Sequence, residues 1–374
     1  MNILLLNTSF LPQIGGVENS MRSLTECLSN SGHNITIIAS DNGNLNLPRL
    51  EHLYGAEIIR YHHANFLSGI INLIKTLKLK KYHDYNIIIS RNMITSLSLI
   101  LLKFKNFNYI VAGVYKNQNK LPPKNSSITS KIKFLLNCQI DKYCFKKCDN
   151  IFVFSSTMQK QIINIFPRRD IKIIRPGVDA NRFSIPNHSE KLALRKKYQI
   201  PLDKKIILGL GRFVHIKNYS TLISSMPNIN DNYSLLLVGE GEELKKYNML
   251  INKYNLHNRV FIFPKTEIPE EFYKLSDIFC LASTYEPFGQ VLLEATSCGL
   301  HILALQSDNE TIYTATHEIY KNYLDLVTFI PNNNTSSFSD TINSLPENIN
   351  FHGRKDFLQR HSWISLIESL KVNR

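Results

Sequence analysis

Residues 2–40 read NILLLNTSFLPQIGGVENSMRSLTECLSNSGHNITIIAS. The stretch begins with a short apolar run, NILLLN, and ends with a second run rich in β-branched residues, NITIIAS. Between the two runs, GGVENSMRSLTECLSNSGH has apolar residues at helical spacing. A strand, a helix and a strand in this order predict a βαβ unit that opens a parallel sheet.

Strand-like apolar runs continue along the chain and then start again. The first half continues with EIIRY, NIIIS, NYIVAG, NIFVFS and IKIIR. After RPGVDANRFSIP and a polar stretch, NHSEKLALRKKYQIPLDKK, the pattern restarts with KIILGLG, YSLLLVG, RVFIF, DIFCLA and HILAL. The two units are expected to join near residues 176–203. The sequence therefore predicts an α/β protein with two doubly wound, Rossmann-like domains. Because such sheets bind ligands beyond the carboxyl ends of their strands, we expect the domains to face each other across a cleft.

The composition limits the class of protein. The chain has 374 residues, of which 43% are hydrophobic and 20% are charged, as is typical of a soluble globular protein with two domains. Six cysteines in so long a chain do not resemble a disulfide framework, so we expect reduced thiols. The opening residues lack the features of a signal peptide, and no segment is apolar over the roughly 18 to 20 residues of a membrane span. These observations predict a cytoplasmic protein.

Positive charge is concentrated in one part of the chain. Residues 71–175 contain 20 Lys and Arg but only four acids, a net charge of +16 that exceeds the +14 of the whole chain. Anionic lipid, nucleic acid or a phosphorylated substrate could each bind such a surface, and a solvated lysine-rich exterior is the alternative. The segment NFLSGIINLIKTLKLKKY, residues 65–82, fits either membrane docking or an amphipathic core helix. Since no recognised nucleic-acid-binding module occurs, we expect no nucleic-acid partner.

Three glycine-containing stretches follow predicted strands. GGVE places Gly15 and Gly16 where a helix begins, and glycine there allows an anion to approach the helix N-terminus closely. GLGRFVHIKN places Arg212 and Lys217 after a strand, where two cations suit a diphosphate. The alternatives are glycines that serve only for turning and surface cations that pair with acids. The third stretch, VGEGEE, predicts another tight turn whose acids, Glu240 and Glu242, cap the following helix.

Two glutamates flank a helix start in YEPFGQVLLEATSCG. Glu286 precedes the helix and Glu294 lies inside it, and a buried acid needs a partner. The amides of Gly289, Gln290 and Val291 would point from the helix N-terminus toward the loop that precedes it. The alternative is that Glu294 pairs with a neighbouring cation and Glu286 caps the helix.

Several nucleotide-binding motifs are absent from the sequence. Neither G-x-G-x-x-G nor the P-loop pattern G-x-x-x-x-G-K-[ST] occurs, which disfavours a nicotinamide enzyme or a kinase. No Asp-x-Asp occurs either, so no carboxylate pair is evident for a magnesium-bound nucleotide. A diphosphate would have to be neutralised by Arg, Lys and backbone amides.

The motifs GGVE, RPGVDANRF, GLGRFVHIKN, VGEGEE and YEPFGQVLLEATSCGL follow one another over nearly the whole chain. In this order they resemble the retaining glycosyltransferases of family 4 (glycosyl transferases group 1), which have the GT-B architecture. The E-x7-E pair is the most specific of them. The resemblance implies an acceptor domain of residues 1–178, a donor domain of residues 179–355 and a terminal helix, residues 356–374, that crosses back to the first domain.

The resemblance also implies a reaction. A sugar would move from a nucleotide-diphosphate sugar to a glycan or lipid-diphosphate-linked acceptor, without a metal or another cofactor, in the synthesis of cell-surface polysaccharide such as lipopolysaccharide, O-antigen or capsule. The protein would be cytoplasmic, and an anionic membrane surface is a further candidate partner at the inner face of the membrane. A noncatalytic sugar-nucleotide-binding protein that partners an active glycosyltransferase is the alternative from another class.

Motif by motif, the resemblance assigns roles to residues. Arg212 and Lys217 would grip the diphosphate and stabilise it as it leaves, an electrostatic role expected to be large in a dry site. Glu286 would contact the hydroxyls of the donor sugar, and Glu294 would hold the ribose. The expected catalytic residues are Glu286, Arg212 and Lys217. The expected donor-binding residues are Gly15, Gly16, Gly211, Glu240, Lys265, Phe288, Gly289, Gln290, Val291 and Glu294.

The sequence departs from the family at two places. Many members carry a histidine at the end of the strand that corresponds to YIVAGVYKN, near the reacting carbon, and here Tyr115, Lys116 and Arg91 are the candidate substitutes. After the second glutamate, members often have Gly-Leu-Pro and then a glycine-rich loop whose amides bind the donor. Here the sequence is GLHILALQSDNETIY, with His301 in place of the proline and no glycine in the loop.

Overall fold

The computed structural model describes residues 1–13, 15–79, 84–119, 123, 126–308, 310–346 and 351–371. The chain divides into two compact units. Unit 1 consists of Met1–Pro176 and Trp363–Arg374, and unit 2 consists of Gly177–Ser362. The domain boundaries expected after residues 178 and 355 thus lie after Pro176 and Ser362 in the structure.

Unit 1 is built on one sheet. Its strands are β1 (Asn2–Leu6), β2 (Asn34–Ser40), β3 (Leu50–Leu53), β4 (Ala56–Tyr61), β5 (Ile87–Ser90), β6 (Asn108–Ile110), β7 (Asn150–Val153) and β8 (Lys172–Ile173). In the described residues these strands lie in the order β3-β4-β2-β1-β5-β6-β7-β8. All neighbours are parallel except β3 and β4, which are antiparallel.

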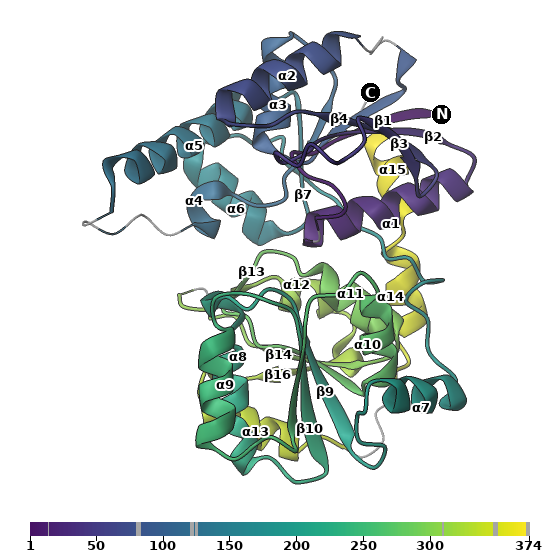
Figure 1. Cartoon of the computed structure of the whole chain (residues 1–374), viewed down its shortest axis with the longest axis vertical. Helices are drawn as coiled ribbons and strands as arrows, with labels where there is room; N and C mark the ends of the chain where they lie inside the picture. The colour runs from purple at the N-terminus through teal and green to yellow at the C-terminus, as the bar shows by residue number, and fades with distance from the viewer. Residues whose placement is uncertain are drawn as a thin grey trace. The chain divides into compact units, whose positions relative to one another are not determined.

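Helices cover both faces of this sheet (Figure 1). They are α1 (Gly16–Asn30), α2 (Phe66–Leu79), α3 (Met93–Leu101), α4 (Tyr115–Gln118), α5 (Ile128–Lys147), α6 (Ser156–Ile165) and α15 (Trp363–Lys371). Residues of α2, α3, α5 and α6 form the apolar core on one face, and residues of α1 and α15 form the core on the other face. Unit 1 is therefore doubly wound, as the sequence predicts.

The C-terminal helix α15 packs in unit 1 beside α1 (Figure 1). Trp363, Leu366, Ile367 and Leu370 recur at helical spacing and are at most 2% exposed. They share a core with apolar side chains of α1 and of strands β1 and β2. The chain thus returns to its first unit after completing the second one, as the crossing helix of the resemblance implies.

Unit 2 repeats the pattern with six strands in the described residues. They are β9 (Lys205–Leu210), β10 (Tyr233–Val238), β11 (Val260–Phe263), β12 (Ile278–Leu281), β14 (His301–Leu305) and β16 (Val327–Ile330), all parallel, in the order β11-β10-β9-β12-β14-β16. A separate pair of two-residue strands, β13 (Tyr285–Glu286) and β15 (Tyr313–Thr314), lies outside this sheet.

The helices of unit 2 also form two layers (Figure 1). Side chains of α8 (Tyr219–Ser225), α9 (Leu244–Lys253) and α13 (Thr335–Asn343) form the core on one face. On the other face, α10 (Pro269–Leu275) and α11 (Gln290–Ser297) contact the strands, and α7 (His188–Lys197) and α14 (Arg354–Arg360) pack outside them. The short helix α12 (Thr316–Tyr320) follows β15.

The strands named from sequence are all present, and the structure adds β3, β13, β15 and β16, which the sequence analysis does not name. The sequence does not predict β3, because LEHL lacks β-branched residues and is mostly exposed. Within the polar stretch NHSEKLALRKKYQIPLDKK, residues 188–197 form α7. The side chain of Asn187, the N-cap residue, accepts a hydrogen bond from the Glu190 amide. No helix in the described residues is long and apolar enough to cross a membrane.

Candidate active site

The loop between β9 and α8 folds Lys217 back onto the end of β9. Gly211 follows β9 with a φ of +147°, and a Cβ there would lie 3.4 Å from Cε of Lys217. Lys217 ends a single turn of 3-10 helix, and Asn218 after it is left-handed. The Asn218 side chain donates a hydrogen bond to the carbonyl oxygen of Ala282, which follows β12. Lys217 is therefore held at the carboxyl edge of the sheet, where β9 and β12 end.

Glu286 is the partner of Lys217. Nζ of Lys217 lies 2.6 Å from Oε2 of Glu286, and the two side chains are 16% and 15% exposed. The short β13–β15 pairing positions Glu286, whose carbonyl oxygen accepts a hydrogen bond from the Ala315 amide. Among the described residues, the Glu286 carboxylate has no second partner. Half of this carboxylate is thus available to a ligand hydroxyl.

The glycines of VGEGEE serve close packing at the same edge. A Cβ on Gly239 would collide with the carbonyl oxygen of Gly211, and one on Gly241 would collide with that of Phe213. Two backbone hydrogen bonds join the loops. The Phe213 amide donates to the carbonyl oxygen of Glu240 at 2.7 Å, and the Glu243 amide donates to that of Phe213 at 3.0 Å. The loops after β9 and β10 therefore form one backbone layer that only glycine allows.

The remaining expected charges of unit 2 are exposed. Arg212 is exposed and makes no ion pair with any residue that the structure describes. Oε1 of Glu240 lies 2.5 Å from Nζ of Lys265, and these side chains are 56% and 51% exposed. Neither Glu240 nor Glu242 caps α9, whose N-cap residue is Glu243 and makes no side-chain capping bond. The expectation of a glutamate cap is wrong, because Glu240 pairs with Lys265.

Helix α11 begins next to Glu286, at the position that the sequence predicts. Gly289 precedes it with a φ of +89°, and a Cβ there would lie 3.1 Å from Cγ of Glu286. Phe288 is 7% exposed and anchors the turn in the core. Within the described part of the chain, the amides of Gln290 and Val291 have no hydrogen-bond acceptor, while the Gln290 side chain donates to the carbonyl oxygen of Gly177. The helix therefore presents open amides beside the Lys217–Glu286 pair.

Glu294 lies one turn further along α11 and is 6% exposed. Its Oε2 accepts a hydrogen bond of 2.9 Å from the Tyr273 hydroxyl. Burial raises the pKa of Glu294 to about 7, although this hydrogen bond and the charge of Arg182 act in the opposite direction. Among the described residues no Lys or Arg lies within ion-pair distance of it. The alternative of a structural ion pair at Glu294 is therefore wrong, and the acid has a single neutral partner.

Gly15 and Gly16 lie in unit 1, where they begin α1. Gly15 is extended and gives the helix no side-chain cap. A Cβ on Gly16 would meet nothing within 4 Å, whereas one on Gly15 would collide with the carboxylate of Glu18. The Ser9 hydroxyl and the Asn7 side chain both donate to Glu18. The space beside Gly16 is thus open, as close approach by a ligand requires.

The residues after β6 correspond to the strand end at which the resemblance leads one to expect a histidine. Here they are held by burial and by a hydrogen bond to Asp141. Val114, after β6, is fully buried, and the Tyr115 amide donates a 2.7 Å hydrogen bond to Oδ2 of Asp141. Burial raises the pKa of Asp141 to about 7, against the effect of this bond. Of the candidate substitutes, Lys116 is exposed and Arg91 is buried.

The segment after α11 also differs from the family pattern. His301 begins β14 at the amino end of the strand, away from the ligand-binding edge, and its Nε2 lies 2.8 Å from the Thr328 hydroxyl. Burial lowers the pKa of His301 to about 4. In the loop after β14, Oδ1 of Asp308 accepts hydrogen bonds of 2.8 Å from the amides of Glu310, Thr311 and Ile312. These three amides of the loop are thus bonded to Asp308.

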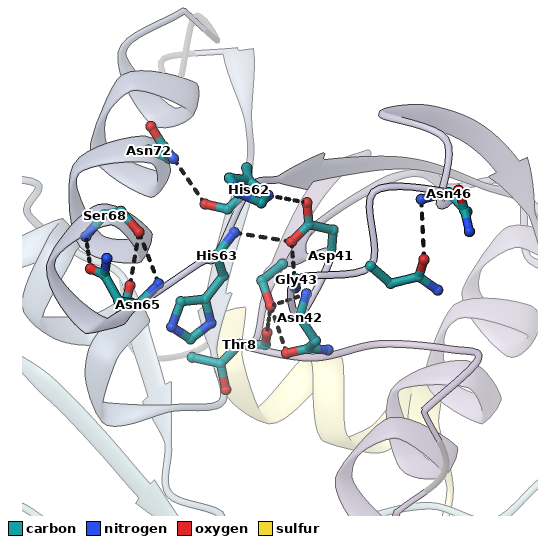
Figure 2. A network of polar contacts seen from close by, with 12 residues as sticks. Thr8, Asp41, Asn42, Gly43, Asn46, His62, His63, Asn65, Ser68 and Asn72 are labelled. Atoms are coloured by element: carbon teal, nitrogen blue, oxygen red, sulfur yellow. Dashed lines mark hydrogen bonds and ion pairs between the residues drawn. The ribbon is translucent and has the colours of Figure 1, made fainter.

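Figure 2 shows a polar network of unit 1 that sequence reasoning missed. Asp41 follows β2 and His62 follows β4, and Oδ2 of Asp41 lies 2.7 Å from Nδ1 of His62. The amides of Gly43 and His63 donate to the other oxygen of Asp41. Burial raises the pKa of Asp41, but the hydrogen bonds outweigh it and hold that pKa below its usual range. In the sequence, an acid follows one strand-like run and two histidines follow another. Their contact could be predicted only by knowing that β2 and β4 are neighbours in the sheet.

Comparisons with known proteins agree with this architecture. The family model "Glycosyltransferase Family 4" matches residues 14–182, and "Glycosyl transferases group 1" matches residues 190–355. Uncharacterized glycosyltransferase MJ1607 of Methanocaldococcus jannaschii is 25% identical over 322 residues, 81% of this chain and 80% of that protein.

A second relative is named as a sugar transferase. The N-acetylgalactosamine-N,N'-diacetylbacillosaminyl-diphospho-undecaprenol 4-alpha-N-acetylgalactosaminyltransferase of Campylobacter jejuni is 22% identical over 298 residues, 77% of each chain. The crystal structure of Anabaena Alr3699/HepE in complex with UDP and glucose matches with a TM-score of 0.76 and 14% identity, over 99% of this chain and 98% of that chain. The chain belongs to glycosyltransferase family 4, the glycosyl transferases group 1, and has the GT-B fold.

Proposed function

We propose that this glycosyltransferase takes its sugar from a nucleotide-diphosphate sugar, retains the anomeric configuration and binds the donor on unit 2. The Lys217–Glu286 pair carries the proposal, because it places a cation and a half-free carboxylate at the carboxyl edge of a doubly wound sheet. The open amides of α11 lie beside it. The UDP and glucose in the Anabaena structure support a donor of this class.

Lys217 and Arg212 would neutralise the diphosphate as it leaves. Lys217 is fixed against Gly211 and needs little rearrangement, while the exposed Arg212 can close on the phosphate as a planar fork. Stabilising charge that develops when the bond to the leaving group breaks is a large catalytic effect. We propose that these cations and the α11 amides serve this purpose without a resident metal.

Glu286 would bind the donor sugar through its free carboxylate oxygen. The bond between the sugar's anomeric carbon and the phosphate oxygen breaks, and the acceptor oxygen forms its bond on the same face of the sugar. The acceptor proton passes to the departing diphosphate, so this step needs no additional protein base. Glu294, which the Tyr273 hydroxyl contacts at 2.9 Å, would also accept hydrogen bonds from the ribose hydroxyls.

The acceptor is proposed to be a glycan or a lipid-diphosphate-linked saccharide that binds to unit 1. Support comes from the +16 charge of residues 71–175 and from the Campylobacter relative, whose name includes a diphospho-undecaprenol acceptor. Helix α2 buries Leu73 and Leu77 but exposes Leu67 and Ile71, which are 70% and 51% exposed. Residues 80–82 of its lysine-rich segment lie outside the described residues. An exposed apolar row beside lysines suits peripheral contact with an anionic membrane from the cytoplasm, in the synthesis of cell-surface polysaccharide.

The test is a donor panel. Purified protein is incubated with UDP-, GDP- and ADP-sugars and a membrane lipid extract, and released nucleoside diphosphate is measured with and without EDTA. We expect release from one donor class, unchanged by EDTA, and a product whose NMR spectrum shows the donor's anomeric configuration. Nucleotide binding without release from any donor would instead support the noncatalytic partner. Cosedimentation with anionic vesicles at low and high salt tests the membrane contact separately.

A further inference from the structure

Arg91 occupies a special place in the sheet of unit 1. It directly follows β5, and its amide donates a 2.8 Å hydrogen bond to the carbonyl oxygen of Leu6, the last residue of β1. From β1, the strands β2, β4 and β3 lie on one side and β5 to β8 lie on the other. Arg91 therefore lies where the winding of the sheet reverses, which is the usual ligand-binding position of a doubly wound sheet.

The guanidinium of Arg91 is buried, and no residue that the structure describes forms a hydrogen bond with it. The residue is 5% exposed, and its guanidinium lies 4.9 Å from the centre of the Phe154 ring. Nε is enclosed and has no hydrogen bond. The terminal nitrogens also make no hydrogen bond with any residue that the structure describes, and they are not among its fully enclosed unpaired atoms. Arg91 thus holds an unused planar fork against an aromatic ring.

Two other arginines are equally buried, and both are bonded. Arg60 is 5% exposed and donates to Glu51 and to the carbonyl oxygen of Leu11. Arg195 is 5% exposed and donates to Asp277 and to the carbonyl oxygen of Leu275, among others. A buried charge without hydrogen bonds or a paired charge is costly, and these two arginines show how this chain ordinarily avoids that cost.

The charges around Arg91 leave it available to an anion. Burial lowers the pKa of Arg91 to about 10, so the side chain stays protonated at neutral pH. Glu18 and Tyr109 act on it in the opposite direction, and Tyr109 is fully buried with a pKa far above neutral, so it carries no charge. Glu18 is the remaining negative neighbour, and it already accepts hydrogen bonds from Asn7 and Ser9.

We propose that Arg91 is an oxyanion-binding residue of unit 1 that takes a phosphate group of a substrate into its unused fork. This inference rests on the proposed function, because that function supplies phosphorylated substrates. The phosphate can come from the lipid diphosphate of an acceptor or from the diphosphate of the donor, and both present the same oxygens to a guanidinium.

The experiment compares phosphate binding and stability in full-length variants. Calorimetric titration with farnesyl diphosphate, with UDP, GDP and ADP, and with inorganic pyrophosphate is carried out on the wild type, Arg91→Gln, Arg91→Lys and Arg169→Gln. Arg169 is an exposed arginine of the same unit and serves as the matched control. We expect Arg91→Gln to lose on the order of tenfold affinity or more for at least one diphosphate, Arg91→Lys to lose less, and Arg169→Gln to bind as the wild type does.

Which probe is affected identifies the source of the phosphate. A loss confined to farnesyl diphosphate assigns Arg91 to the acceptor, and a loss for a nucleoside diphosphate assigns it to the donor. The urea denaturation midpoint of Arg91→Gln should equal or exceed that of the wild type, because an unpaired buried charge is removed.

Three results would overturn the inference: a wild type that binds none of the probes, unchanged binding in Arg91→Gln, or a marked loss of stability in both Arg91 variants. Nucleotide release by the wild type is measured independently in the donor panel, so failure of the proposed function can be recognised separately.

Discussion

Two lysine–carboxylate pairs of unit 2 have equal lengths and different surroundings. Nζ of Lys191 lies 2.6 Å from Asp277, which precedes β12 at the amino edge of the sheet. Nζ of Lys217 lies 2.6 Å from Glu286 at the carboxyl edge. The distance alone therefore does not distinguish a structural pair from a functional pair.

The other oxygens of the two carboxylates make the difference. Oδ2 of Asp277 accepts hydrogen bonds of 2.6 Å from the Arg195 guanidinium and from the Ile206 amide, so this carboxylate joins α7, β9 and β12. Glu286 has no partner besides Lys217 among the described residues. A fully bonded carboxylate stabilises the fold, whereas Glu286 keeps one oxygen free at the carboxyl edge, where we propose that the donor sugar binds.

The largest effect on stability is expected from Asp277→Ala. This change leaves the buried Arg195 without its carboxylate, which should cost about 3–5 kcal/mol of unfolding free energy in urea denaturation. Glu286→Ala removes a pair with one partner and should cost about 1 kcal/mol. Equal destabilisation by the two changes would contradict the distinction between the pairs.

Glu294 should make stability depend on pH. Its pKa is raised to about 7 from 4.5, so the folded state binds a proton that the unfolded state has lost between these values. Stability from this group therefore falls as pH rises from about 4.5 to about 7, by roughly 3 kcal/mol, and then stays constant. Glu294→Gln should remove this fall when unfolding free energies are measured across the range. If the unfolding free energies of Glu294→Gln and of the wild type changed equally with pH, the proposed effect of Glu294 would be refuted.

Tyr273→Phe should have a smaller effect at the same place. The hydroxyl is the one described hydrogen-bond donor to Glu294, and the tyrosine is fully buried. Its removal should cost about 1 kcal/mol in urea denaturation above neutral pH, where the carboxylate is charged, and less near pH 5. When Glu294 is replaced by Gln, the destabilisation caused by Tyr273→Phe should no longer depend on pH. A double-mutant cycle at the two positions would measure this.

Gly16→Ala should change stability least. The added methyl group meets nothing within 4 Å, so the unfolding free energy should stay within about 0.5 kcal/mol of the wild-type value. If Gly16 contributes to nucleotide binding, as the resemblance implies, nucleotide affinity should fall nonetheless. Gly239→Ala is the contrasting variant, since its methyl group would collide with the backbone of Gly211 and impair folding. Unchanged nucleotide affinity in Gly16→Ala would remove that glycine from the site.

The repeating strand pattern was sufficient to predict both doubly wound units, because buried parallel strands appear in sequence as apolar β-branched runs. The start of α11 after Gly289 was also predictable, since glycine before a helical apolar pattern is a local signal. The β3 strand was not predictable, because an exposed edge strand lacks an apolar pattern.

Pairings within the site depend on the folded chain and could not be predicted. Lys217 and Glu286 are far apart in sequence, and only the adjacency of β9 and β12 brings their loops together. The same holds for the pairs of Glu240 with Lys265 and of Asp41 with His62. It also holds for Arg91, whose guanidinium has no hydrogen-bond partner among the described residues.

We propose that the Lys217–Glu286 pair acts in the reaction and that the equally short Lys191–Asp277 pair does not. The most direct measurement is the rate of nucleoside diphosphate release by Lys217→Ala and Lys191→Ala under conditions where both are folded. We predict that Lys217→Ala lowers kcat about 10²- to 10³-fold, whereas Lys191→Ala retains the wild-type rate, since Asp277 keeps Arg195 and the Ile206 amide. Wild-type turnover in Lys217→Ala, or an equal loss in both variants, would contradict the claim.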